Sequence, residues 1–167
     1  MKISAEALIE KLNLVPLPEE GGYYCESYRA KGFIPAEALP EHGGRRCYGT
    51  CIYYLLTPDE FSGLHTVTSD EVFHFYAGDL CEMIQIAQDG TLTEHRLGID
   101  FAAGQRPQVV VQAGVWQGSR LAEGGQWALL GCTVSPGFEF SDFTTASRQE
   151  LTQRFPQHAA RIEQFTH

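Results

Sequence analysis

The middle of the chain is a succession of short apolar runs separated by turn residues, and this pattern limits the possible folds most strongly. Strands are predicted at 22–29, 46–56, 64–68, 70–77, 80–87, 91–97, 107–112, 115–121 and 126–134. No helix-length segment separates these runs, which excludes parallel βαβ units. Asp89-Gly90 and Gly124-Gly125 each predict a hairpin. Many short antiparallel strands predict an all-β sandwich, jelly roll or small barrel, with any binding site in its interior.

Short helices are expected at both ends of this strand-rich middle. Ser4 is a typical helix N-cap residue, and the helix that follows it should end near Leu12. Near the other end, Ser147 and Glu150 have the spacing of a capping box. A chain of 167 residues falls within the size range of one domain. We therefore expect a single domain over residues 1–167.

Charge and composition limit the partners. The chain has 12 Lys and Arg against 21 Asp and Glu, a formal charge of −9, which argues against nucleic acids and anionic membranes as partners. No apolar run is long enough to span a bilayer, and Glu6 and Glu10 interrupt the segment that would be apolar in a signal peptide. The five cysteines have no zinc-site or disulfide-framework spacing. We therefore expect a cytoplasmic protein with reduced thiols.

One segment carries a constellation of chemically active residues. His65 and Glu71 fit the pattern H-x-V-x3-E-x6-G. This resembles the first motif of the cupin superfamily, H-x-H-x3or4-E-x6-G, with Val67 in place of the second histidine. The second cupin motif ends in P-x-G-x2-H, and residues 112–117 occupy its place, with Gln117 where cupins have histidine. In metal-bearing cupins three histidines and one glutamate bind the ion, so this chain keeps two of those four ligands in type.

The resemblance narrows to the small cupin family Cupin_5. Four segments resemble its motifs: Glu20–Arg29, Ser69–Phe75, Ala113–Gln117 and Gly131–Phe138. Cys25 and Gln112 depart from the family pattern, which usually has Arg and Pro there. The resemblance runs from about Leu12 to Thr166. It implies a cupin double-stranded β-helix (jelly roll) that forms a homodimer, with a pocket in the barrel and a structural likeness to sugar-nucleotide epimerases. The family has no settled biochemical function.

The residues at the metal positions make a weak metal site. Val67 cannot bind a metal, and Gln117 offers one neutral carbonyl oxygen. His65, Glu71 and Gln117 would together hold a divalent ion only loosely. The expectation is therefore no resident cofactor, with a weakly bound divalent metal as the alternative.

Acid–base chemistry is the other use of the same residues. Histidine as a residue type exchanges protons near neutral pH, and a carboxylate beside it can orient its ring. Glu71 shares a strand face with Phe73 and Phe75, where an acid is costly without a partner. His65 and Glu71 are therefore the predicted catalytic residues, while a plain buried hydrogen bond is the structural alternative for His65. The predicted ligand-binding residues are Gln117, Tyr28, Glu26, Tyr54 and Ser119.

Three functions remain open from the sequence. The favoured one is binding of a small polar molecule in the barrel pocket, with isomerase- or epimerase-like chemistry on a sugar-type or carbonyl substrate. The alternatives are a non-catalytic ligand-binding module and a weakly metal-dependent cupin enzyme. The cations available to an anionic ligand are Arg29, Arg45, Arg46 and Arg120. Since Arg45 and Arg46 are adjacent, one of them is expected at the mouth of the pocket.

Overall fold

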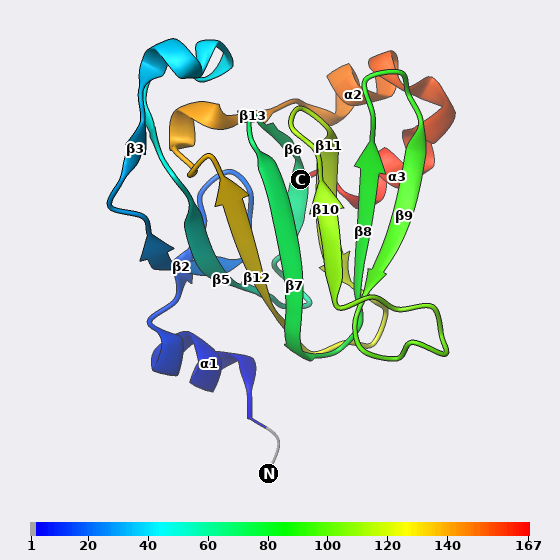
Figure 1. The fold of residues 1–167 in the computed structure, drawn as a ribbon. Helices are drawn as coiled ribbons and strands as arrows, with labels where there is room; N and C mark the ends of the chain where they lie inside the picture. Colours follow the sequence, from blue (N-terminus) through cyan, green and yellow to red (C-terminus); the bar gives the residue numbers. More distant parts are fainter. Residues whose placement is uncertain (1–2) are drawn as a thin grey trace.

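The structure is a computed structural model that describes residues 3–167. Two antiparallel β-sheets face each other, as the ribbon in Figure 1 shows. The six-stranded sheet has the order β1-β2-β5-β12-β7-β10, with bounds β1 Val15–Pro16, β2 Tyr23–Arg29, β5 Thr50–Leu56, β12 Ala128–Ser135, β7 Asp70–Gly78 and β10 Gln108–Val111. The five-stranded sheet has the order β13-β6-β11-β8-β9, with bounds β13 Phe143–Thr145, β6 Ser62–Val67, β11 Trp116–Leu121, β8 Cys81–Ile86 and β9 Leu92–Leu97.

The chain passes repeatedly from one sheet to the other. Strands β5, β6, β7 and β8 alternate between the sheets, and β9, β10, β11 and β12 do so again. This alternation is the arrangement of a jelly roll, and it confirms the predicted all-β class. A small separate pair is formed by β3 (Phe33–Ile34) and β4 (Arg46–Cys47).

The two predicted hairpins have different outcomes. Strands β8 and β9 pair in register across Asp89-Gly90, as expected. The second prediction was wrong, because Gly124-Gly125 joins β11 in one sheet to β12 in the other. The Asp79 carboxylate fixes this crossover by accepting from the backbone N–H of Gln126 at 2.7 Å. Glycines marked the turn correctly but carried no information about the pairing partner.

Helices α1 (Ala5–Leu12) and α2 (Arg148–Arg154) begin directly after the predicted capping residues, and a third helix, α3, spans Ala159–Gln164. Ser4 Oγ accepts from the backbone of Ala7, which caps α1. Ser147 and Glu150 form the predicted capping box before α2. Within residues 3–167, no helix is both long enough and apolar enough to span a bilayer.

The sheets and helices bury three apolar clusters. One lies between the five-stranded sheet and the C-terminal helices α2 and α3, and it includes Trp116 and Phe155. Another lies between α1 and the six-stranded sheet around Leu55; Figure 1 shows α1 beside the β2 end of that sheet. The largest cluster fills the space between the two sheets, where Met83 and Leu130 are fully buried. Part of the space between the two sheets is hollow, and this cavity is the candidate binding site.

Candidate functional site

A cavity of about 530 Å³ opens between the two sheets. Its walls come from β2, β5, β7 and β12 of one sheet, from Val67 of β6 and Phe143 of β13 in the other sheet, and from the loops that precede β2 and β13. The apolar residues of its lining are Leu17, Pro18, Tyr24, Ile52, Tyr54, Val67, Phe73, Val134, Phe138, Phe140 and Phe143. The polar ones are Glu19, Glu20, Glu26, Arg29, Thr50, Glu71, Cys132 and Glu139. The volume of this cavity is in the range of small-molecule sites, and its lining combines eleven apolar residues with eight polar ones.

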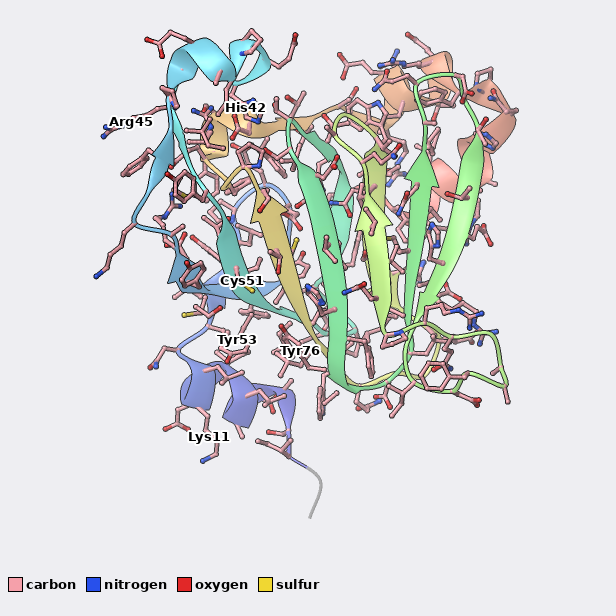
Figure 2. All side chains as sticks on the ribbon, in the orientation of Figure 1. Lys11, His42, Arg45, Cys51, Tyr53 and Tyr76 are labelled. Atoms are coloured by element: carbon pink, nitrogen blue, oxygen red, sulfur yellow. The ribbon has the colours of Figure 1, made fainter. Side chains whose placement is uncertain are left out.

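Glu71 lies in the wall of this cavity because of the period-2 alternation of β7. Glu71, Phe73 and Phe75 are buried on the inner face of that strand, as predicted. His74 points to the opposite face, where it stacks on Tyr76 with ring centroids 6.3 Å apart. Tyr76 is labelled in Figure 2, near α1 and Tyr53. A shared role of His74 and Glu71 at one site is therefore excluded.

Three of the predicted site residues form one hydrogen-bonded group. The Gln117 side-chain nitrogen donates to Glu71 Oε2 at 2.7 Å and to His65 Nε2 at 2.9 Å. The pairing of His65 opposite Gln117 on β6 and β11 brings these two side chains together. The Cys132 thiol donates to the other Glu71 oxygen at 3.5 Å. Both carboxyl oxygens of Glu71 are thus held by donors.

The contacts of His65 determine its tautomer. Nδ1 lies 2.8 Å from the Gly63 carbonyl oxygen, which can only accept, so Nδ1 carries a proton. Nε2 then accepts from the Gln117 amide, which is the arrangement of a neutral imidazole. The ring packs on Phe143, with centroids 4.9 Å apart, and the residue is only 1% exposed. His65 does not line the cavity, and Gln117 stands between it and Glu71.

Glu20 lies beside this group, although it was not among the predicted site residues. Its Oε1 accepts from Ser62 Oγ at 2.8 Å, and its Oε2 lies 3.9 Å from His65 Nε2. The turn that presents Glu20 depends on Gly21 and Gly22, which have φ values of 98° and 72°. A Cβ on Gly21 would lie 2.2 Å from a backbone oxygen in the loop before β6, so the close approach needs glycine. The sequence Glu-Gly-Gly was the signal that could have identified Glu20.

Burial and neighbouring charge change the proton affinities in the cavity wall. Burial raises the pKa of Glu71 to about 7, and the neighbouring Glu20 carboxylate contributes to that rise. Burial also raises the pKa of the Tyr54 hydroxyl well above 10, and the Glu20 carboxylate adds to that effect. Tyr54 donates to the Gly21 carbonyl at 2.8 Å. Near neutral pH, Glu71 exists in both protonation states, whereas Tyr54 keeps its proton.

Of the other four predicted ligand-binding residues, two line the cavity and two do not. Tyr54 and Glu26 line the cavity, but Tyr28 and Ser119 do not. A bulge in β2 between Glu26 and Tyr28 changes the alternation, so Tyr28 is 59% exposed. Ser119 is fully buried on β11, beyond the cavity wall. Neither Tyr28 nor Ser119 is placed to touch a ligand in this cavity.

The bulge in β2 also sets the cation at the cavity mouth. Arg29 lines the mouth and bridges Glu26 at 2.8 Å and Glu139 at 2.7 Å. The expectation that Arg45 or Arg46 would reach the mouth was wrong. Arg46 is buried against the Asp142 carboxylate. Arg45 packs over the Phe33 ring and points away from the sheets, as Figure 2 shows.

Comparisons with known proteins agree with this architecture. Residues 6–146 match the Cupin_5 family, described as Cupin superfamily (DUF985). The chain belongs to the Cupin_5 family. A hypothetical protein from Leishmania major has 34% identity and a TM-score of 0.90, with 99% of each chain covered. Protein SO0799 from Shewanella oneidensis has 37% identity and a TM-score of 0.89, again with 99% of each chain covered.

Two further proteins are more distantly similar to this Cupin_5 chain. The uncharacterized protein YML079W of Saccharomyces cerevisiae is 29% identical over 95% of this chain and 84% of its own length. Oxalate decarboxylase from Bacillus subtilis has 14% identity and a TM-score of 0.55, covering 92% of this chain and 37% of its own. At that identity the likeness concerns the fold alone. The predicted cupin jelly roll is therefore confirmed, and the family has no assigned function.

The residues at the cupin metal position of this Cupin_5 chain do not fit a metal. Among residues 3–167, no group of three or more His, Cys, Asp or Glu side chains is arranged to hold an ion. The Gln117 amide nitrogen, a donor, occupies the point where the acceptors of His65 and Glu71 converge. Two hydrogen bonds there take the place of metal–ligand bonds. Val67, which stands at the position of another cupin metal ligand, is apolar and cannot bind an ion.

Proposed function

We propose that this protein binds a small polar molecule in the cavity and moves a proton to or from it through Glu71. The single observation that carries the proposal is the position of the Glu71 carboxyl, buried in an apolar wall yet part of the cavity lining. A carboxyl with a pKa of about 7 can take up and release a proton near neutral pH. Buried carboxyls of this kind are concentrated at functional sites.

The residues around Glu71 have separate roles in this proposal. Gln117 orients the carboxyl, and His65 orients Gln117 through its fixed tautomer. His65 is therefore a positioning residue rather than the proton carrier that the sequence predicted. Tyr54 keeps its proton and donates it to the Gly21 carbonyl, so its oxygen faces the cavity as an acceptor only. A carboxyl that takes up and releases a proton favours removal and return of a proton beside a carbonyl group, an isomerase- or epimerase-like reaction on a sugar-type or carbonyl substrate.

Deuterium uptake tests the proposal even though the product is unidentified. Ketoses, aldoses and small α-hydroxy ketones are incubated with the protein in D2O, and proton NMR follows exchange at the carbon beside the carbonyl. We expect exchange with at least one compound, reduced by about 100-fold or more in Glu71→Gln. Glu10→Gln, the same charge change on exposed α1, is the matched control. Equal exchange in Glu71→Gln and the unmodified protein would overturn the role of Glu71.

A non-catalytic binding module is the second candidate. Both oxygens of Glu71 already accept hydrogen bonds, from Gln117 and Cys132, and this arrangement favours a fixed binding group. A module of this type predicts that a ligand raises the melting temperature according to mass action while no deuterium enters it. Binding without exchange would therefore favour the module over the enzyme.

We also infer a cytoplasmic homodimer. The short strand β1 pairs only with Tyr23 and Tyr24 of β2, so the bulged half of β2 lies at the sheet edge with Tyr28 exposed. Pairing with a second copy is one way to cover such an edge. All five cysteines are free thiols, which suits a reducing compartment. Light scattering of the purified protein and of Tyr28→Arg tests the dimer: a monomer in both samples would overturn it.

A further inference from the structure

The charges in the cavity wall are strongly one-sided. Five glutamates line the cavity, namely Glu19, Glu20, Glu26, Glu71 and Glu139. Arg29 is the single cationic side chain of that lining in residues 3–167. The chain as a whole carries −9, so the surroundings do not offset this local negative potential.

Arg29 has no donor left for an anionic ligand. Its Nε–H and one Nη2–H donate to the Glu26 carboxylate, and a second Nη2–H donates to the Phe138 carbonyl. Its Nη1 group donates to Glu139 and to the Cys47 sulfur. Since a guanidinium has five N–H donors, all of them are engaged within the protein. Capture of a phosphate or carboxylate by Arg29 would require breaking the ion pairs that hold the mouth.

Aromatic rings provide the other half of the cavity chemistry. Six of the lining residues are aromatic: Tyr24, Tyr54, Phe73, Phe138, Phe140 and Phe143. Phe138 and Phe140 stand edge to face at the mouth, with centroids 5.3 Å apart. The faces of such rings attract cations, and the attraction is stronger where water is displaced. Aromatic faces and carboxylates around one cavity select positively charged organic groups.

We propose that the ligand of this cavity is a small organic cation, an alkylated ammonium or protonated amine with an apolar body. The inference rests on the proposed function, because it names the charge of the molecule that the same cavity binds. The ammonium group lies among the aromatic rings and Glu20, and the remaining part of the ligand extends toward Glu71. Sugar nucleotides and other polyanions are excluded by the same arrangement.

Three molecules of the same shape and different charge test this proposal. Choline is the cation, 3,3-dimethylbutan-1-ol its neutral isostere, and 3,3-dimethylbutanoate the anion. Each is titrated into the isotope-labelled protein, and the dissociation constant is read from the amide signals of cavity residues. We expect choline to bind at least about tenfold more tightly than the alcohol, with no binding of the anion.

Two variants separate a local effect from the overall charge. Glu20→Gln removes a carboxylate from the cavity and should reduce the preference for choline over the alcohol several-fold. Glu10→Gln makes the same charge change on α1, outside the cavity, and should leave that preference unchanged. An equal loss in both variants would overturn the local assignment.

The remaining outcomes distinguish this inference from the proposed function. Equal or tighter binding of the alcohol or the anion overturns the cation preference. Absence of binding by all three molecules also overturns it. In both cases the proton-transfer proposal is judged separately, by deuterium uptake and its dependence on Glu71.

Discussion

The Gln117 amide nitrogen lies 2.7 Å from Glu71 Oε2 and donates one hydrogen to it. Its other hydrogen is donated to His65 Nε2, at 2.9 Å. One neutral side chain thus joins an acid and a base that are both buried. The hydrogen bond favours the ionised form of Glu71, but burial opposes it more strongly, and the pKa is raised as a result. This balance makes the site sensitive to pH and to single substitutions.

Glu71 should make the protein less stable as the pH rises toward neutrality. Its pKa is about 7 in the folded protein and 4.5 when unperturbed, so the folded state binds the proton more tightly. The stability contributed is complete below pH 4.5 and is lost as the pH rises through 7, which corresponds to about 3 kcal/mol. Urea unfolding at pH 5 and pH 8 measures the change. Glu71→Gln should show a smaller loss between these two values.

The control for this measurement is Glu10→Gln on α1. It should lose as much stability as the unmodified protein over the same interval. Identical pH profiles for Glu71→Gln and the unmodified protein would show that Glu71 ionises normally in the fold.

Removal of the Gln117 amide should destabilise the fold. Gln117→Met fills a similar volume but leaves the Glu71 carboxyl and His65 Nε2 without their donor. The expected cost is about 2–5 kcal/mol, because two buried polar groups lose a partner. Urea unfolding at pH 7 gives this value. In the double variant Glu71→Leu/Gln117→Met, part of the loss should be recovered, and strictly additive effects would contradict a direct coupling.

The meeting of His65, Glu71 and Gln117 could be predicted because the resemblance to the two cupin motifs assigns all three residues to positions of one site. The same reasoning missed Glu20, whose contact with Ser62 joins residues 42 positions apart. That contact requires a turn with two positive-φ glycines. The alternation of side chains along a strand does not indicate which way such a turn directs Glu20.

The placement of Tyr28 failed for a related reason. One extra residue in a β-bulge reverses which side chains face inward, and the strand pattern of 22–29 gives no sign of it. The Gly124-Gly125 turn failed because local chain reversal does not specify which sheet receives the next strand. Fold class and capping depend on local sequence, so they could be predicted. Bulges and crossovers depend on the packing of distant segments.

The buried pair of Arg46 and Asp142 should be essential to stability. Both residues are nearly inaccessible, at 5% and 3% exposure, and Arg46 Nε donates to the carboxylate at 2.8 Å. Asp142→Asn leaves the guanidinium buried without a countercharge, at an expected cost of about 3–5 kcal/mol. Urea unfolding measures it, with Asp59→Asn at an exposed position as control. A cost equal to that of the control would mean that Arg46 is solvated elsewhere.

Metal content should depend on the residues at positions 67 and 117. In the unmodified protein, the Gln117 amide occupies the point where a cation would meet His65 and Glu71, so metal should be far below one ion per chain. Val67→His/Gln117→His supplies two imidazoles beside His65 and Glu71, and it should bind nearly one divalent ion per chain. Elemental analysis after purification without chelators or affinity metals decides the matter. Stoichiometric metal in the unmodified protein, lost in His65→Ala with the fold intact, would contradict this account and assign the site to metal-assisted chemistry.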